Sequence, residues 1–358
     1  MKSKLILAIN PGSTSTKIAV FEDTNCIFIQ SLKHSNEDLS KFSKIADQFE
    51  YRKDIIMKVL SENNIEINNI KIIVGRGGLV KPIKSGVYAI NEQLIKDLTI
   101  GVSGQHASNL GGLIADDIAQ SIPDAKAFIA DPVVVDELDD VARISGHPEL
   151  DRISIFHALN QKAIARTYAK SISTKYEDLN LIVVHLGGGI SVGAHKKGKV
   201  IDVNQALDGD GPFSPERTGT LPVGALVKLC FSGKYSEQEI KKMINGKGGY
   251  VAYLGTNDAY TVEKRVESGD AKATLIQDAM IYQIAKEIGA MSTVLYCNVD
   301  AILFTGGIAH DKVFVEKLKS RVGKIAPVFV YPGEDEMKAL AMNGLMVLNN
   351  EIEVLQYN

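Results

Sequence analysis

The chain has 358 residues, of which 45% are hydrophobic and 23% charged. This length exceeds what a single hydrophobic core usually supports, so we expect two domains. Its 40 basic and 43 acidic side chains leave a formal net charge of −3, which excludes the strongly basic surface typical of proteins that bind nucleic acid or anionic membranes.

The cysteines and the apolar segments favour a cytoplasmic location. Cys26, Cys230 and Cys297 lie far apart with no Cys-x-x-Cys pair, so neither a disulfide framework nor a zinc site is predicted. The apolar run Leu5–Ile9 is too short for the core of a signal peptide, and no segment approaches the length of a membrane helix. We therefore expect a soluble protein in a reducing compartment.

Strands and helices alternate through residues 5–130. Leu5–Ile9 and Ile18–Phe21 are apolar runs on either side of a polar turn, which predicts two buried strands joined by that turn. Apolar residues at helical spacing predict a helix over Gln48–Glu62. Further strands are predicted at Lys71–Val74 and at Ala127–Ala130, the second ending where proline cannot donate to a ladder. This alternation is typical of α/β proteins.

The same order of elements returns after residue 150. A helix over Ser154–Lys170 precedes a second apolar strand, a glycine turn and a strand that reaches His195. The later predicted elements are a strand at Lys199–Val203, a Gly- and Pro-rich loop at Asp208–Pro222, a helix at Thr274–Tyr296, a strand at Ala301–Thr305, a helix at Asp311–Arg321, a strand at Pro327–Tyr331 and a helix from about Glu334 to Leu348. The repeated units Leu5–Phe21 and Leu181–His195 predict two homologous lobes with a ligand cleft between them.

The glycine turns have the composition of phosphate-binding loops. A triphosphate needs backbone N–H groups that point at its oxygens, and glycine permits that close approach. The first turn adds Ser13, Ser15 and Lys17, whereas the second, Gly187–Gly189, offers backbone alone. Neither a P-loop nor a Rossmann motif occurs. One such turn could equally be a tight β-hairpin, but two copies and a third turn at Gly306-Gly307 favour phosphate binding.

Three runs together resemble the acetate and butyrate kinase family, which belongs to the superfamily of sugar kinases, heat-shock ATPases and actin. They are Ile9–Lys17, His185–Gly189 and Phe304–Ile308, and the resemblance extends from Leu5 to about Leu348. It implies an α/β fold of two ribonuclease H-like (actin-like ATPase) domains with a central interdomain cleft. The lobe on the acyl-substrate and phosphate side would comprise residues 1–137 and a C-terminal helix over 337–358, and the nucleotide-binding lobe residues 138–336.

Within this family the turns are closer to butyrate kinases than to acetate kinases. Acetate kinases carry Asn-Ala-Gly-Ser-Ser-Ser in the first turn and His-Leu-Gly-Asn-Gly in the second. Here Pro11 replaces the alanine and Gly188 the asparagine, so backbone N–H groups must replace a side-chain amide. The resemblance therefore implies reversible, Mg²⁺-dependent transfer of a phosphoryl group from ATP to the carboxylate of butyrate, which gives butyryl phosphate and ADP.

Cationic side chains suit this chemistry. A carboxylic acid with a pKa of ~4–5 is ionised at pH 7 and needs no general base. Because two anions must approach each other, arginine, lysine, histidine and Mg²⁺ should dominate the site. The resemblance assigns catalysis to Arg76, His157, Arg217 and Asp131, and binding of the acyl substrate to His106, Asn109 and Arg76.

The resemblance also assigns residues to phosphate, metal and nucleotide. The phosphate-binding set is Asn10, Ser13, Ser15, Lys17, His185, Gly187, Gly188 and Gly189, in which the role of His185 is left open. The metal ligands would be Asp131 and Glu336, with Glu334 as an alternative. The nucleotide would contact Asn257, Asp258, Gly306, Gly307 and Ile308.

Two other functions stay open at this point. One is a kinase for branched acids such as isobutyrate or isovalerate, because one methylene changes binding by only ~1–3 kcal/mol. The other is a non-catalytic ATP-switched module related to actin or the chaperones, which would not need Arg76, His157 and Arg217. The resemblance also implies a homodimer or a higher homo-oligomer, without a nucleic-acid or membrane partner.

Overall fold

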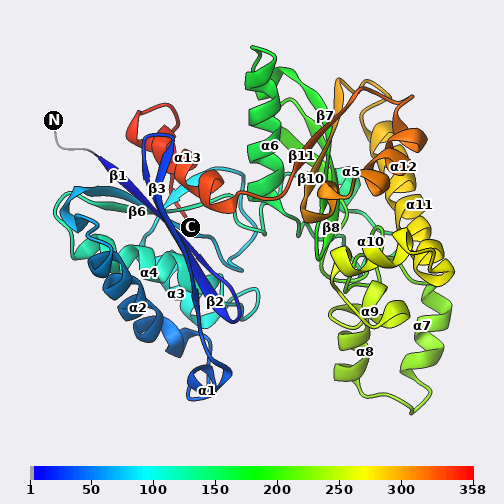
Figure 1. The fold of residues 1–358 in the computed structure, drawn as a ribbon, viewed down its shortest axis with the longest axis horizontal. Helices are drawn as coiled ribbons and strands as arrows, with labels where there is room; N and C mark the ends of the chain where they lie inside the picture. The colour runs from blue at the N-terminus through cyan, green and yellow to red at the C-terminus, as the bar shows by residue number, and fades with distance from the viewer. Residues whose placement is uncertain (1–3) are drawn as a thin grey trace. The chain divides into compact units, whose positions relative to one another are not determined.

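The computed structural model describes residues 4–358 and divides into two compact units (Figure 1). Unit 1 runs to Val135 and resumes at Asp335, and unit 2 is Asp136–Glu334. The sequence predicts domain boundaries between residues 137 and 138 and between residues 336 and 337, two residues after those of the structure in each case. Residues 1–3 of the first expected domain lie outside the described residues.

Unit 1 is built on a sheet with the strand order β12-β5-β6-β4-β1-β2-β3. Its strands are β1 (Leu5–Pro11), β2 (Ser15–Glu22), β3 (Asn25–Lys33), β4 (Ile70–Arg76), β5 (Val87–Ala89), β6 (Lys126–Ala130) and β12 (Val354–Leu355). β1 pairs antiparallel with β2 and parallel with β4, and β4 pairs parallel with β6. The carboxyl ends of β1, β4 and β6 therefore meet at one edge of the sheet.

Helices cover both faces of this sheet (Figure 1). On one face α2 (Phe49–Glu62) and α4 (Asn109–Gln120) bury a core with Leu7, Ile9 and Ile18. On the other face α13 (Glu336–Leu348) approaches so closely that a Cβ on Gly344 would lie 2.9–3.1 Å from Val74, Ile72 and Ile6. The remaining helices are α1 (Asn36–Leu39), α3 (Glu92–Ile100) and the 3-10 turns η1 (Ala46–Gln48) and η2 (Ile67–Asn69).

The C-terminal segment differs from the prediction. The expected helix over 337–358 is too long, because α13 ends at Leu348 and the chain then forms β12, which pairs in parallel with β5. Beyond β12 the side chain of Tyr357 is buried, donates from its hydroxyl to Asp97 Oδ2 (2.7 Å) and accepts from the Lys81 N–H (3.1 Å). The end of the chain is thus anchored in unit 1 by a strand and a tyrosine.

Unit 2 repeats the topology of unit 1. Its sheet has the order β11-β10-β7-β8-β9, with antiparallel pairs β7–β8 and β8–β9 and parallel pairs β7–β10 and β10–β11. The strands are β7 (Asn180–Leu186), β8 (Ile190–Lys196), β9 (Lys199–Val203), β10 (Ala301–Gly306) and β11 (Val328–Pro332). The order equals β6-β4-β1-β2-β3 of unit 1, which confirms the predicted duplication.

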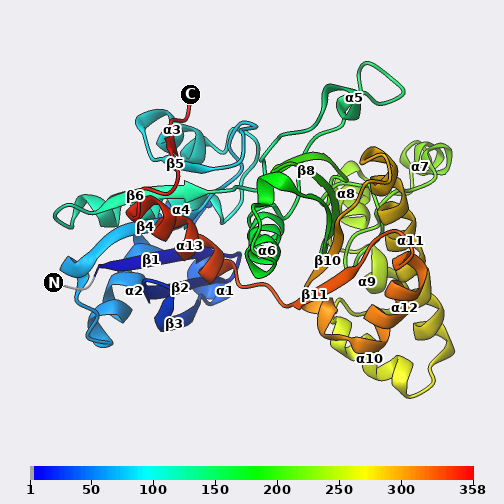
Figure 2. The same cartoon turned by 90° about the horizontal axis from the view of Figure 1, so that it is seen from above.

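Alternate residues of β7 face different helices, as the period of a strand requires. Helices α6 (Ala158–Ser171) and α11 (Ala271–Val294) lie on opposite faces of this sheet (Figure 2). Leu181 and Val183 pack against α6, and Ile182 and Val184 pack in the core that contains Ile284 of α11. The other elements of this unit are α5 (Asp140–Arg143), η3 (Tyr176–Asp178), α7 (Val223–Cys230), α8 (Glu237–Ile244), α9 (Gly249–Leu254), α10 (Ala259–Glu267), α11 (Ala271–Val294), η4 (Gly307–His310) and α12 (Lys312–Val322). None of the helices within residues 4–358 is both long and apolar enough to cross a membrane.

Candidate active site

A buried arginine supports the first glycine turn from below. Arg52 of α2 is 0% exposed, and its guanidinium donates to the carbonyl oxygens of Gly12 (2.7 Å), Ser13 (3.0 Å) and Ser15 (3.1 Å). In a trans peptide the C=O and the following N–H point in opposite directions. The N–H groups of Ser13 and Thr14 therefore point away from Arg52, which is the orientation that an anion on the outer side of the turn requires.

Sequence reasoning missed Arg52, although a signal was present. Arg52 lies four residues before Ile56 and so on the same face of the helix, which is buried. A cation on that face must have internal acceptors. The side chain of Gln48 accepts from its Nη2 at 2.8 Å, and Thr16 Oγ1 accepts from its Nη1 at 3.2 Å.

The register of β1 with β4 brings polar side chains together on the face of the sheet that α13 covers. Asn10 continues the face of Ile6 and Ala8, and Arg76 continues that of Ile72 and Val74. Arg76 Nη1 donates to Glu336 Oε2 (3.0 Å) and Asn10 Oδ1 (3.2 Å), and Asn10 Nδ2 donates to Glu336 Oε2 (2.5 Å). Lys17 pairs with Asn10 across β1 and β2 and is exposed. Three predicted residues, Asn10, Arg76 and Glu336, are thus in direct contact.

Asp131 occupies a strained position just after β6. Its φ is 37°, in the left-handed region that is unusual for a residue with a Cβ, and its side chain is buried. Its Oδ1 accepts from Ser85 Oγ (2.6 Å) and the Gly86 N–H (2.9 Å). These bonds fix the carboxylate beside the strand end at which Ala130 pairs with Arg76.

The two predicted acyl-binding residues after α3 differ in exposure. His106 is exposed, and its Nδ1 accepts from the Ser108 N–H at 3.2 Å. Asn109 is buried, and its amide bonds to backbone groups of Leu79 (2.8 Å) and Gly104 (3.0 Å). Asn109 therefore holds the segment that follows Arg76, and its direct contact with a substrate stays a prediction.

In unit 2 the second turn lies against Arg217. A Cβ on Gly189 would collide with Arg217 Nη1, so only glycine admits the guanidinium at this position. Ser214 Oγ donates to the Gly188 carbonyl (2.6 Å), and Arg217 Nη1 donates to the Ala206 carbonyl (2.7 Å). Burial lowers the pKa of Arg217 from its usual value, but an arginine remains charged at neutral pH.

Two histidines stack beside the same turn. The ring centroids of His157 and His185 are 3.7 Å apart and their planes differ by 12°. His157 Nδ1 lies 2.9 Å from Ser191 Oγ, and His185 Nδ1 lies 2.9 Å from Asn160 Oδ1. His185 Nε2 is also 3.5 Å from Glu334 Oε2, which places the alternative metal ligand Glu334 beside a histidine.

The third glycine turn borders a cavity. Gly306 has a φ of 90°, and a Cβ there would collide with the Leu186 carbonyl, whereas a Cβ on Gly307 would meet no atom within 4 Å. A cavity of about 250 Å³ lies beside it. Its walls are Tyr250, Ala259, Tyr260, Glu263, Gln277, Gly307, Ile308, His310, Asp311 and Phe314. Flat aromatic and apolar walls with a few polar groups are typical of a small-molecule pocket.

Asn257 and Asp258 lie next to this cavity in sequence but are engaged elsewhere. Asn257 Nδ2 donates to Glu216 Oε2 (3.2 Å). The carboxylate of Asp258 caps α10 by accepting from the N–H groups of Tyr260 and Thr261. Their contact with a nucleotide stays a prediction.

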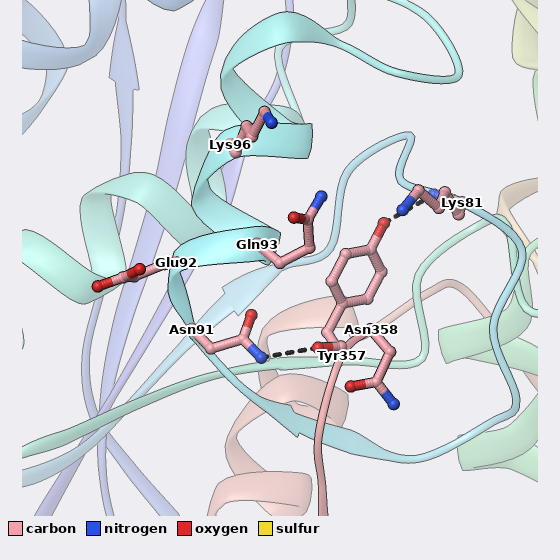
Figure 3. Close-up of a pocket in the computed structure, with 7 residues that line it drawn as sticks. All are labelled: Lys81, Asn91, Glu92, Gln93, Lys96, Tyr357 and Asn358. Atoms are coloured by element: carbon pink, nitrogen blue, oxygen red, sulfur yellow. Dashed lines mark hydrogen bonds between the residues drawn. The ribbon is translucent and has the colours of Figure 1, made fainter.

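A wider hollow in unit 1 contains none of the predicted site residues (Figure 3). Its volume is about 750 Å³, and it is lined by Lys81, Asn91, Glu92, Gln93, Lys96, Tyr357 and Asn358. Asn91 Nδ2 donates to the Tyr357 carbonyl at 2.7 Å, and burial raises the pKa of Tyr357 to about 12. This hollow surrounds the anchored C-terminus, not the glycine turns.

Relatives of known name match the whole chain. The profile described as "Acetokinase family" matches residues 152–330. Butyrate kinase 2 of Clostridium acetobutylicum is 57% identical over 357 residues, which cover 100% of both chains. Butyrate kinase 1 of the same organism is 57% identical over 352 residues, or 98% of this chain and 99% of that one.

Solved structures with lower identity share the fold. Acetate kinase of Porphyromonas gingivalis has a TM-score of 0.79 at 18% identity and covers 97% of this chain and 100% of its own. A propionate kinase of Francisella tularensis subsp. tularensis has a TM-score of 0.72 at 20% identity, with 95% and 98% covered. Together with the two sheets of equal strand order, these matches confirm the predicted two-domain, actin-like ATPase fold.

Proposed function

Because this chain belongs to the acetokinase family, we propose that it is a butyrate kinase, which transfers the γ-phosphoryl group of ATP reversibly to the carboxylate of butyrate. The observation that carries this proposal is the 57% identity with two butyrate kinases over essentially the full chain. The reaction joins a carboxylate oxygen to phosphorus and breaks the bond between the γ-phosphorus and the bridging oxygen, giving butyryl phosphate and ADP.

The hydrogen-bond donors near the glycine turns, two arginines and a histidine, suit an anionic acceptor. Butyrate is already ionised at neutral pH, so the chain must reduce repulsion between anions and need not remove a proton. In unit 2 Arg217 and His157 lie against the second turn, and in unit 1 Arg76 is oriented by Glu336 and Asn10. We assign Arg217 and His157 to the transferring phosphoryl group and Arg76 to the carboxylate.

The donor chemistry of unit 1 fits magnesium. Mg²⁺ takes one or two carboxylates, and phosphate oxygens and waters complete its coordination. Asp131 and Glu336 supply such carboxylates, and no group of three metal-binding side chains occurs among the described residues. We assign these two residues to hold the ion, which would neutralise charge on the phosphates of ATP.

The nucleotide site follows from the third turn. We assign the purine to the cavity beside Gly307 and Ile308, where the missing side chain of Gly307 leaves room. The N–H groups of the first and second turns would bind phosphate oxygens.

The test is a hydroxamate assay. The protein is mixed with ATP, Mg²⁺, hydroxylamine and one acid of a C2–C5 panel that includes isobutyrate and isovalerate, and the hydroxamate is measured. We expect the highest kcat/KM with butyrate, and no product without Mg²⁺. A higher value with a branched acid would make the chain a branched-chain acid kinase, and no product with any acid would overturn the proposal.

Two properties of the family also belong to the proposal. We expect a cytoplasmic enzyme, in keeping with three exposed, unpaired cysteines, Cys26, Cys230 and Cys297. We also expect at least a dimer, which light scattering on the purified protein measures directly.

A further inference from the structure

A chain of side-chain hydrogen bonds runs through unit 2 from Tyr176 to His157. Tyr176 Oη lies 2.7 Å from His195 Nδ1, and His195 Nε2 lies 2.8 Å from Gln161 Oε1. Gln161 Nε2 lies 2.8 Å from Ser191 Oγ, which in turn lies 2.9 Å from His157 Nδ1. Tyr176, Gln161, Ser191 and His195 are all buried.

The orientation of the Gln161 amide is fixed by a backbone group. Its Nε2 donates to the Ser191 carbonyl oxygen at 3.1 Å as well as to Ser191 Oγ. A carbonyl oxygen can only accept, so the amide nitrogen must face Ser191 and the amide oxygen must face His195. His195 Nε2 therefore carries a hydrogen and donates it to Gln161.

His195 is neutral, which fixes the next bond. It is completely buried, and burial together with the charges of Lys162 and Arg166 holds its pKa well below the usual range. A neutral imidazole has one N–H. Because that hydrogen is on Nε2, Nδ1 is an acceptor, and the hydroxyl of Tyr176 donates to it.

The bond from Gln161 to Ser191 also determines the direction of the bond between Ser191 and His157. Ser191 Oγ accepts from Gln161, so its own hydrogen must go to another group. Its other side-chain neighbour in the hydrogen-bond network is His157 Nδ1, and a buried hydroxyl donates where an acceptor is available. Nδ1 of His157 is then an acceptor, and the ring hydrogen lies on Nε2.

We propose that Gln161, Ser191, His195 and Tyr176 are positioning residues that hold His157 as its Nε2–H tautomer, so that this histidine presents a hydrogen-bond donor to the transferring phosphoryl group. This inference rests on the proposed function. It is supported by the place of His157, whose Cε1 would lie 3.3 Å from a Cβ on Gly189, so the ring borders the second turn. The other tautomer would direct a lone pair at the anion.

The first test reads the tautomer itself. Nitrogen NMR of the full-length protein labelled at histidine, with His157→Gln for assignment, should show the Nε2–H tautomer of His157 at neutral pH. In Ser191→Ala this preference should be lost. A wild-type protein with the hydrogen of His157 on Nδ1 would overturn the proposal.

The second test reads turnover. Ser191→Ala should lower kcat about tenfold with little change in the KM for ATP, the lower end of the 10–100-fold effects seen for partners that orient metal-bound histidines. Ser292→Ala is the matched control, because Ser292 is also buried in unit 2 but donates only to the Gly289 carbonyl of its own helix. It should leave kcat unchanged.

A double-mutant cycle distinguishes positioning from general damage. In a His157→Ala background Ser191→Ala should have no further effect on kcat, and full additivity would overturn the proposal. Gln161→Leu, which removes the amide that donates to Ser191 Oγ, serves if Ser191→Ala does not fold, and it should reduce the tautomer preference of His157. Absence of acyl phosphate from wild type would refute the butyrate kinase proposal alone, since the NMR result does not depend on turnover.

Discussion

The two phosphate-binding turns have the same strands around them but different supports. The first turn rests on a buried cation, Arg52, which binds three of its carbonyl oxygens. The second turn has a neutral support, the hydroxyl of Ser214, and its cation Arg217 lies against the glycine that a ligand would approach. The two units therefore share their sheet order but differ in where the arginine lies. Arg52 lies beneath the first turn, and Arg217 lies on the side of the second turn that a ligand would approach.

The different positions of the two arginines indicate different functions: Arg52 orients the backbone of its turn, and Arg217 takes part in catalysis. A cation that is 0% exposed and bound by five acceptor atoms can orient a backbone but cannot move to a substrate. Arg217 makes fewer bonds and is only partly buried, so its guanidinium can also bind an anion. We therefore expect substitution of Arg52 to affect stability and ATP binding, and substitution of Arg217 to affect turnover.

The largest effect is expected from Arg217→Ala. Loss of an arginine that stabilises a transferring phosphoryl group typically costs about 10³–10⁵ in kcat, so hydroxamate formation should fall at least about 10³-fold. Calorimetry should show nearly unchanged ATP affinity. Arg321→Ala, an exposed arginine of α12, is the control and should retain full activity. Retention of turnover in Arg217→Ala would remove this residue from the mechanism.

Arg52→Met should destabilise the protein by about 3 kcal/mol, because it leaves the carbonyls of Gly12, Ser13 and Ser15 without their donor. Urea denaturation measures this loss, and the KM for ATP should rise more than kcat falls. Lys58→Met on the exposed face of the same helix controls for the loss of charge and should change stability by less than about 0.5 kcal/mol. Equal denaturation midpoints for both variants would show that Arg52 does not support the turn.

The sequence was sufficient for most of the strands and for the glycine turns, but not for β3, β5 and β12, nor for the residues that support the turns. Apolar runs beside glycine identify β1, β2, β7 and β10, since burial and turn geometry are local properties. Helices α7–α10 were missed because the residues between the Gly- and Pro-rich loop and α11 carry mixed patterns, with exposed apolar side chains such as Val223 and Phe231. The C-terminal strand β12 was missed because two residues carry no periodic signal.

The residues of the candidate site also divide into those that the sequence predicts and those that it does not. Asn10, Arg76 and Glu336 are far apart in sequence, and only the register of β1 with β4 and the packing of α13 explain their contact. The resemblance to the family predicted these three residues as site residues, but it did not explain why they lie in contact. Arg52 and Gln161 belong to no motif, because their function is to bond to groups of the turn or to other side chains. Only the hydrogen bonds of the folded chain identify such residues.

A partly buried carboxyl in unit 2 provides a smaller effect on stability, with a defined sign. Burial, together with Asp210 and Asp202, raises the pKa of Glu287 to about 7 from its ordinary 4.5. The unfolded chain ionises first, so the folded state loses stability as pH rises from 4.5 to 7. Glu287→Gln should therefore be more stable than wild type by about 2 kcal/mol at pH 8 and nearly equal to it at pH 4.5. Glu316→Gln, exposed on α12, should show no such difference, and a pH-independent effect of Glu287→Gln would exclude titration as its cause.

The smallest expected effect has the opposite sign and lies beneath the first turn. His34 Nε2 is 2.8 Å from Thr16 Oγ1, and burial and the charge of Arg52 lower the pKa of His34 to about 4. Because the unfolded histidine protonates near 6.5, its contribution to stability is complete above that pH and is lost as pH falls from 6.5 to 4. His34→Gln cannot titrate, so its stability should fall less than that of wild type between pH 7 and pH 5 in urea denaturation. His147→Gln, in an exposed loop, should follow the wild-type curve. Parallel curves for wild type and His34→Gln would show that the buried cation below the turn does not keep this histidine neutral.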